Sequence, residues 1–244
     1  MLAREYDLVL IAIQTLTRVP VPAPFAPDAL RQATRYFPLV GLLIGLTAAA
    51  VFTLARIGLP PLIAALLSLA ATLLLTGALH EDGLADCCDG LFGGRTRDDA
   101  LRIMRDSRIG AFGTLGLIVT IALKTAALAA LPNAAAALIT AHAAGRFWTL
   151  PPAALLPYAR PSGMAGSVAA PPAACLAIGA IPGLAPLLLL GPAALPALFA
   201  SAATAALAAL YARHRLGGYT GDVLGAIAIL TELSVLLAAL WHAA

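Results

Sequence analysis

The chain has 244 residues and a net charge of +3, with 61% hydrophobic residues, 11% charged residues and a mean hydropathy of +0.93. Soluble domains carry about 25% charged residues, so this composition excludes an ordinary soluble globular protein. The apolar stretches are continuous rather than alternating, which favours helices over a transmembrane barrel. No basic stretch is interleaved with aromatic residues, which argues against a nucleic-acid partner. The sequence therefore predicts an all-α, polytopic helical bundle in a lipid bilayer, forming one integral membrane domain over residues 1–244.

The first 36 residues are predicted to lie at the membrane surface rather than to cross it. Residues 6–18 form an apolar stretch that is short and interrupted by polar side chains, which is typical of an interfacial helix. Residues 19–35 contain four prolines and predict a loop. We therefore expect an interfacial helix followed by a loop over residues 1–36.

The rest of the chain contains about seven stretches that approach or exceed the roughly 20 apolar residues needed to cross a bilayer. They cover residues 37–55, 61–79, 109–131, 134–157, 169–190, 193–212 and 223–241. Some prolines fall inside apolar stretches and predict kinks or broken helices there. These prolines are Pro151, Pro152, Pro182 and Pro186.

The distribution of positive charge predicts the orientation of these spans. With the N-terminus inside, 12 of the 15 Lys and Arg residues fall in the inner segments. They are Arg4, Arg18, Arg31, Arg35, Arg95, Arg97, Arg102, Arg105, Arg108, Arg160, Arg213 and Arg215. Cytoplasmic loops are enriched in Lys and Arg, so the sequence predicts a multi-pass protein of the cytoplasmic (inner) membrane whose charged loops face the cytoplasm.

The segment 80–108 concentrates acidic side chains between apolar stretches and is the predicted catalytic region. Asp82, Asp86 and Asp89 follow one another at i, i+4 and i+7, so they share one face of a helix. Carboxylates grouped in this way repel one another unless a cation binds between them. Oxygen ligands of this kind suit Mg²⁺, with Mn²⁺ as a substitute. The predicted metal ligands are Asp82, Asp86 and Asp89, together with the adjacent Glu81.

The second half of this segment predicts phosphate contacts. Gly93 and Gly94 allow close backbone approach and exposed N–H groups. Thr96 followed by Asp99 resembles a capping box and predicts the start of a second helix. Three arginines recur at three-residue spacing along that helix, and arginine binds phosphate bidentately. They are Arg102, Arg105 and Arg108, with Asp106 among them.

Further polar residues lie towards the C-terminus and inside the spans. Residues 213–222 form a glycine-containing second cytoplasmic loop, and Asp222 opens the last span, so Asp222 either starts that helix or joins the site. Ionisable side chains inside spans are costly and are functional candidates by default. They are Lys124, His142, Arg146 and Glu232. Arg146 and Glu232 lie at similar depth, and we predict that they pair.

Several of these runs resemble the cobalamin synthase family, the adenosylcobinamide-GDP ribazoletransferases. They are EDGLADCCDGLFGG at 81–94, MRDSRIGAFG at 104–113 and GGYTGDVLGA at 217–226, preceded by LTRVPVP at 16–22 and YFPLVG at 36–41. The similarity covers essentially the whole chain. It implies an integral membrane enzyme that joins adenosylcobinamide-GDP to α-ribazole or α-ribazole 5′-phosphate. The products are adenosylcobalamin or its 5′-phosphate and GMP, and Mg²⁺ is the implied cofactor.

The resemblance also implies roles for the polar residues. A ribazole hydroxyl would attack the phosphorus that carries the cobinamide, and the aspartates would hold Mg²⁺ on the diphosphate. Either Asp89 or Asp106 would accept the hydroxyl proton. The residues predicted to bind substrate or phosphate are Arg102, Arg105, Arg108, Gly93, Gly94, Arg146, Asp222 and Glu232.

Three alternatives are weighed against this interpretation. A CDP-alcohol phosphotransferase would carry the pattern D-G-x-x-A-R, whereas Asp82-Gly83 is followed here by Ala85-Asp86. An intramembrane prenyltransferase would carry a second Asp-rich motif, which this sequence lacks. A polytopic transporter would explain the buried charges but not carboxylates, a glycine turn and arginines gathered at one face. The sequence leaves the oligomeric state open, a homo-oligomer included.

Overall fold

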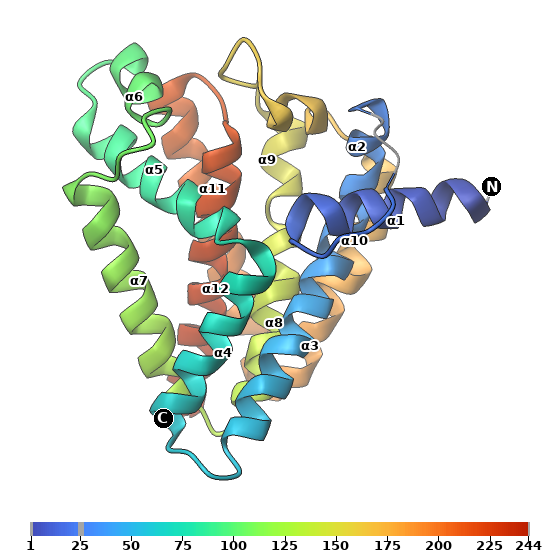
Figure 1. The fold of residues 1–244 in the computed structure, drawn as a ribbon, viewed down its shortest axis with the longest axis vertical. Helices are drawn as coiled ribbons and strands as arrows, with labels where there is room; N and C mark the ends of the chain where they lie inside the picture. Colours follow the sequence, from blue (N-terminus) through green and yellow to red (C-terminus); the bar gives the residue numbers. More distant parts are fainter. Residues whose placement is uncertain (1, 24–26, 244) are drawn as a thin grey trace.

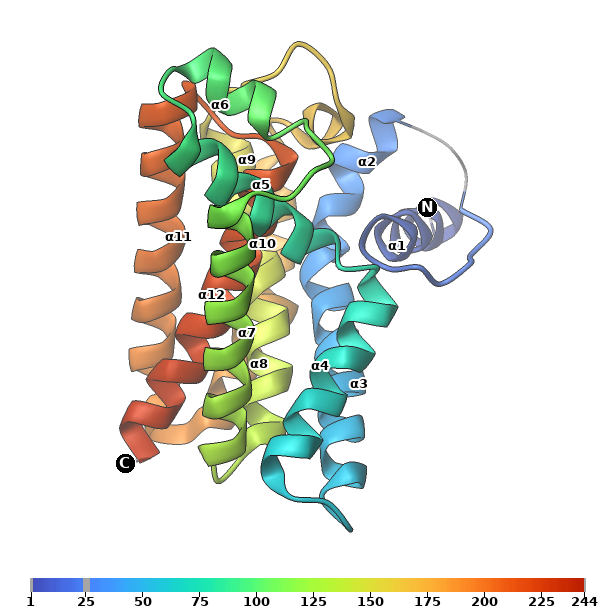
Figure 2. The ribbon, with the colours of Figure 1, turned by 60° about the vertical axis from the view of Figure 1, so that its left-hand side comes forward.

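The structure, a computed structural model, describes residues 2–23 and 27–243. Within these ranges every named element is a helix, and the one β-type pairing is an isolated bridge between Tyr158 and Tyr219. The long helices run side by side along the longest axis (Figure 1, Figure 2). They are α3 (Phe37–Ala55), α4 (Pro61–Thr76), α7 (Ala111–Ala130), α8 (Ala134–Phe147), α10 (Ala173–Leu184), α11 (Ala194–Leu216) and α12 (Gly221–Ala243). The predicted all-α helical bundle is confirmed.

The predicted spans all fall on helical segments, but not all of these helices are long enough to cross a bilayer alone. Four segments of the described chain pass by length and composition, namely Ala29–Ala55, Ala111–Ala130, Ala173–Leu216 and Gly221–Ala243. A fifth passes only if α4 and α5 (Leu79–Gly93), which meet at 91°, count as one span. The segment Ala173–Leu216 is itself divided by the 3₁₀ segment η3 (Ala185–Ala193), where Gly191 has a non-helical backbone.

One predicted span is broken at its prolines, and one predicted loop is partly helical. The stretch 134–157 is not one helix, because α8 ends at Phe147 and α9 (Leu150–Leu155) begins with prolines in its first turn. This confirms the break predicted at Pro151 and Pro152. The region 19–35 is not wholly a loop, because it contains α2 (Pro27–Ala33) and the start of the 3₁₀ turn Thr34–Tyr36. Proline is compatible with the first turn of a helix, so the prolines here do not exclude one.

The N-terminal helix α1 (Leu2–Leu16) lies across the bundle near the end that carries α5, α6 (Arg97–Ile103) and α9, as both ribbon views show. Its buried side, which includes Leu8, Ile11 and Leu16, joins a cluster with Phe37 of α3. This crosswise placement agrees with a helix that lies along a membrane surface.

Helix α5 packs against α12 through glycines. A Cβ atom at Gly83 would lie 2.9 Å from the carbonyl oxygen of Asp222 and 3.0 Å from its Cα. A Cβ atom at Gly225 would lie 3.3 Å from the Cα of His80. The two backbones therefore approach so closely that Asp82 of α5 and Asp222 of α12 reach the same region, although they are far apart in the sequence.

Gly83→Ala is expected to push α5 away from α12, because the added methyl group meets backbone atoms that cannot rotate aside. Overpacking of this kind costs about 1–3 kcal/mol, and it would also separate Asp82 from Asp222 and lower activity. Thermal unfolding in detergent measures the first effect. The matched control is Gly58→Ala, where no atom lies within 4 Å of the new Cβ. Equal melting temperatures for the two variants would contradict this packing.

Candidate active site

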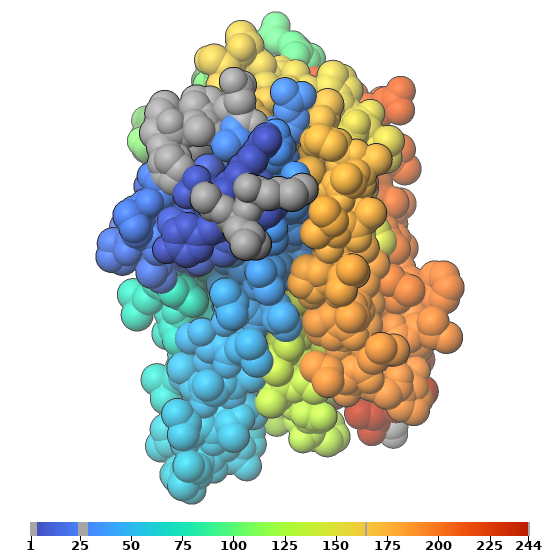
Figure 3. Space-filling view, turned by 90° about the vertical axis from the view of Figure 1, so that its right-hand side faces the viewer, coloured from blue at the N-terminus to red at the C-terminus, as the bar shows by residue number. Residues whose placement is uncertain are grey.

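A cavity of about 270 Å³, here called the central cavity, lies between α1, α5, α8, α12 and the segment that follows α9. Its apolar wall includes Leu16 and Phe37 from the N-terminal part of the chain. Figure 3 shows this part, in blue, on the left of the molecule beside the gold segment that follows α9. Its polar lining gathers residues from four separate segments, namely His80, Asp82, Arg146, Arg160 and Asp222. Of the predicted site residues, Asp82, Arg146 and Asp222 therefore lie in one cavity.

Carboxylates accumulate at one side of the central cavity. Arg160 donates from Nη2 to Oδ2 of Asp222 at 2.6 Å, and the Thr220 hydroxyl lies 3.2 Å from the same oxygen. Burial and the negative charges of Asp222 and Asp82 raise the pKa of Asp86, one turn along α5, to about 7. The negative charges of Asp222 and Asp82, which add to burial in opposing ionisation of Asp86, would favour a cation beside them.

The donor set fits a cation that is shared with a substrate. Among residues 2–23 and 27–243, no three His, Cys, Asp or Glu side chains are grouped to hold a metal ion by themselves. Mg²⁺ is usually bound through one or two carboxylates together with substrate phosphates rather than by a complete protein cage. Asp82 and Asp222, which both line the central cavity, can supply such carboxylates.

Two of the predicted metal ligands are placed elsewhere. Asp89 accepts hydrogen bonds from the backbone N–H groups of Gly110 at 2.7 Å and Gly113 at 2.8 Å, which satisfies free N–H groups at the start of α7. Glu81 borders a separate small cavity with Lys124, and its Oε2 is buried without a hydrogen-bond partner in the described chain. Neither residue lines the central cavity, and Asp86 does not line it either.

Asp89→Asn tests whether Asp89 acts through structure. The amide keeps only one acceptor oxygen, so we expect a stability loss of about 1 kcal/mol, as for other helix-start residues. The KM for Mg²⁺ is expected to stay within about twofold, because the structural role needs no metal. If Asp89→Asn raised this KM as strongly as Asp82→Asn, Asp89 would be a metal ligand after all.

The row of arginines predicted along one helix is not continuous. Thr96 starts α6 as predicted, accepting from the backbone N–H of Asp99 at 3.1 Å, but the helix ends at Ile103. Asp106 accepts from both the backbone and the guanidinium of Arg108, and such local bonds compete with helix formation. These bonds lower the pKa of Asp106 to about 2, which makes this exposed carboxylate a weak proton acceptor.

A second cavity, here called the arginine cavity, has a volume of about 600 Å³ and lies between α6 and residues 158–161. Its charged lining consists of Arg97, Asp98, Arg102, Arg105 and Arg160. Tyr158 and Arg160 border both cavities. Arg108, the third predicted phosphate ligand, does not line it.

The predicted glycine turn serves to pack helices together. The N–H of Gly94 donates to the carbonyl of Gly90 at 3.0 Å, and its own carbonyl accepts from Arg215 at 2.6 Å. Gly93 is exposed and borders neither cavity. The role of these glycines in phosphate binding stays a prediction. The Gly94 N–H already donates to the Gly90 carbonyl and is not free to bind a phosphate.

Three arginines have contacts that sequence reasoning missed. Arg97 donates to the carbonyls of Leu216 at 2.7 Å and Ala159 at 2.9 Å. Arg215 binds the end of α5, and basic residues near helix ends often bind free carbonyls in this way. Arg160 followed by Pro161 gives no sequence signal beyond a positive charge in a loop, so its place between the two cavities could not be expected.

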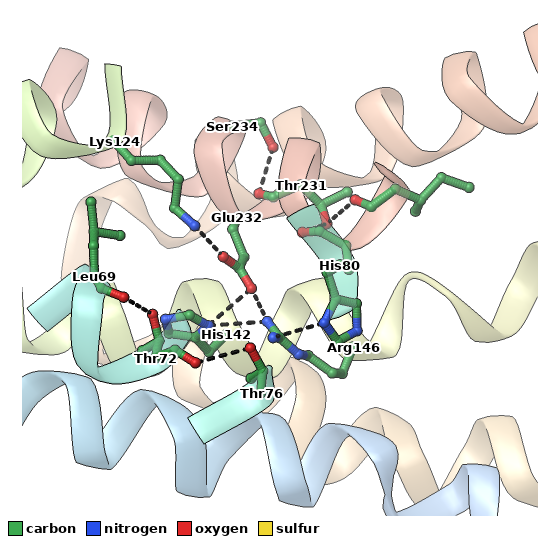
Figure 4. Close-up of polar contacts among 12 residues, drawn as sticks. Leu69, Thr72, Thr76, His80, Lys124, His142, Arg146, Thr231, Glu232 and Ser234 are labelled. Atoms are coloured by element: carbon green, nitrogen blue, oxygen red, sulfur yellow. Dashed lines mark hydrogen bonds and ion pairs between the residues drawn. The ribbon is translucent and has the colours of Figure 1, made fainter. Parts of the chain in front are cut away.

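A buried ionic network, drawn in Figure 4, adjoins the central cavity through His80 and Arg146. Glu232 of α12 is bound by Lys124 of α7 at 2.6 Å and by His142 of α8 at 2.9 Å, and it forms an ion pair with Arg146. The predicted pairing of Arg146 with Glu232 is confirmed. The second ion pair of Glu232, with Lys124, was not predicted. Arg146 also lies 3.5 Å from His80, so the network extends from the middle of the bundle to the cavity wall.

Comparison with known proteins gives one consistent family. The family model described as cobalamin-5-phosphate synthase matches residues 8–240. Relatives named adenosylcobinamide-GDP ribazoletransferase include one from Bradyrhizobium diazoefficiens, 46% identical over 94% of this chain and 91% of its own. Others are from Ralstonia nicotianae (47%, covering 93% and 92%) and Leptothrix cholodnii (44%, covering 97% and 96%). No solved structure matches the chain.

Proposed function

The chain belongs to the cobalamin-5-phosphate synthase family, and we propose that it joins adenosylcobinamide-GDP to α-ribazole, or its 5′-phosphate, at the central cavity. The reaction gives adenosylcobalamin, or its 5′-phosphate, and GMP. The observation that carries this placement is the convergence of Asp82, Asp222 and Arg160 on one cavity. The family match runs through nearly the whole chain, so a CDP-alcohol phosphotransferase or a transporter is disfavoured.

The chain supplies groups for each part of a phosphoryl-type transfer. The acceptor hydroxyl oxygen forms a bond to the phosphorus that carries the cobinamide, and the bond from that phosphorus to GMP breaks. A carboxylate of the central cavity takes the hydroxyl proton. Arg160 lies beside Asp222, where its guanidinium would contact oxygens of the reacting phosphate and stabilise the charge that develops there.

Mg²⁺ is the cofactor that we propose for this reaction. Asp82 and Asp222 would hold it together with the substrate phosphates, and its chemistry would be to neutralise the diphosphate as GMP leaves. The two carboxylates that line the same cavity support this choice. Mn²⁺ has the same preference for oxygen ligands and is expected to substitute for it.

We further propose that this end of the bundle faces the cytoplasm in the cytoplasmic membrane. Arg97, Arg102, Arg105, Arg160 and Arg215 all lie at the end that carries the two cavities. An excess of arginine on one side of a membrane protein favours the cytoplasmic side. The donor and acceptor would then reach the cavities from the same side.

GMP release tests the proposed function. The purified protein in nanodiscs is incubated with adenosylcobinamide-GDP and α-ribazole 5′-phosphate, either with Mg²⁺ or with EDTA. We expect GMP and a cobamide product only when both substrates and the metal are present. Folded protein that forms no product with Mg²⁺ would contradict the proposal.

A further inference from the structure

The central cavity and the arginine cavity are divided only by a short segment of chain. Tyr158 and Arg160 face both cavities. Between them, the backbone N–H of Ala159 donates to the carbonyl of Tyr219 at 2.8 Å, and the carbonyl of Ala159 accepts from Arg97. These hydrogen bonds hold the segment between the two cavities in place. A ligand that contacts Arg160 can therefore extend into either cavity.

The two cavities differ in their chemistry. The central cavity combines apolar side chains such as Leu16, Leu30 and Phe37 with two carboxylates and two arginines, so its charges balance. The arginine cavity has four arginines and a single carboxylate, Asp98. The first suits the base of the acceptor nucleoside, and the second suits an anionic phosphate group.

The arginine cavity presents cationic groups that the protein leaves free. Within the described ranges, the Arg105 guanidinium has no hydrogen bond or ion pair, since only its backbone N–H is bonded, to Arg102. The ion pair of Arg102 with Asp99 is long, at 3.4 Å, and exposed, and such surface pairs contribute little. The Nε of Arg160 is buried without a partner in the described chain. Free guanidinium groups of this kind favour phosphate as a ligand.

We propose that the arginine cavity binds the nucleoside monophosphate half of the donor, the half that leaves as GMP, while the acceptor occupies the central cavity. This inference rests on the proposed function. The reacting phosphorus then lies at Arg160, with the attacking hydroxyl on the side of the central cavity and the leaving phosphate on the other. Attack and departure from opposite sides are what in-line phosphoryl transfer requires. The electron pair of the broken P–O bond stays with GMP, and the hydroxyl proton goes to a carboxylate of the central cavity.

The test measures GMP binding and steady-state kinetics with Arg102→Gln and Arg105→Gln. We expect each variant to bind GMP about tenfold more weakly and to raise the KM for adenosylcobinamide-GDP about tenfold, as loss of a charge-assisted phosphate contact predicts. The KM for α-ribazole 5′-phosphate should change less than about twofold, because the acceptor does not use these arginines. The matched control is Arg95→Gln, an exposed arginine of the same charged segment that borders neither cavity.

A second experiment uses an acceptor that lacks the 5′-phosphate. It shows whether the arginine cavity binds the phosphate of the acceptor or that of the donor. With α-ribazole as acceptor, the variants should show the same rise in the KM for the donor. If they instead raised only the KM for α-ribazole 5′-phosphate and left GMP binding unchanged, the cavity would bind the acceptor and the inference would be overturned. Unchanged GMP binding with both KM values unchanged would also overturn it. Failure of the proposed function looks different, because wild-type protein would then form no product from the two substrates.

Discussion

Asp82→Asn is expected to lower kcat for GMP release at least about a hundredfold while the protein stays folded, because it removes one of the charges that would hold Mg²⁺ on the diphosphate. Asp82 is exposed at the central cavity, so the amide replaces the carboxylate without any repacking. The loss should therefore appear in turnover and in Mg²⁺ dependence rather than in stability. Steady-state GMP release over a Mg²⁺ titration measures it.

Two comparisons make this prediction specific. Asp89→Asn changes a carboxylate of the same helix that binds backbone N–H groups instead, and it should keep the Mg²⁺ dependence of the wild type. Equal melting temperatures for Asp82→Asn and wild type would exclude unfolding as the cause of lost activity. Near-normal Mg²⁺-dependent turnover by Asp82→Asn would contradict the proposed site.

Glu232→Gln is expected to destabilise the protein by about 3–5 kcal/mol, because it leaves two buried cations without their counter-ion. Glu232 has no exposed surface and binds both Lys124 and Arg146. Thermal unfolding in detergent and the yield of folded protein measure this effect. A Glu232→Gln variant with the melting temperature of the wild type would contradict it.

A double variant separates the lost charge from lost packing. Glu232→Gln combined with Lys124→Met removes one cation together with the anion, and replacing both partners of a buried pair is far less costly than removing one. The double variant should therefore regain part of the stability. Exchanging Arg146 and Glu232 is not expected to do so, because Lys124 and His142 would then face an arginine in place of a carboxylate.

The ion pair of Arg146 with Glu232 could be predicted from the sequence. A helix rises 1.5 Å per residue, so the positions of the two residues in their spans put them at similar depth. The sharp turn between α4 and α5 could not be predicted from the sequence, because it depends on left-handed backbone at both Gly77 and Ala78. Glycine is a known stop signal at such a position, whereas a positive φ at alanine has no signature in the sequence.

The helical spacing of the aspartates predicted a shared face but not what each one touches. Asp89 finds its partners at the start of α7, and Asp82 finds Asp222 only because glycines bring α5 and α12 together. Helical spacing predicts that Arg105 lies on the same helix as Arg102, but this helix ends at Ile103. The local bonds of Asp106 that compete with the helix are not visible in the spacing. Contacts between segments far apart in the sequence determine which residues form the site, and a single sequence does not reveal these contacts.

Binding of Mn²⁺ in the presence of adenosylcobinamide-GDP, followed by electron paramagnetic resonance, shows whether Asp82 and Asp222 hold the metal ion. We expect wild type and Asp89→Asn to bind the ion equally, while Asp82→Asn and Asp222→Asn weaken its binding at least about tenfold. Undiminished binding by Asp82→Asn and Asp222→Asn, with loss in Asp89→Asn, would contradict this metal site.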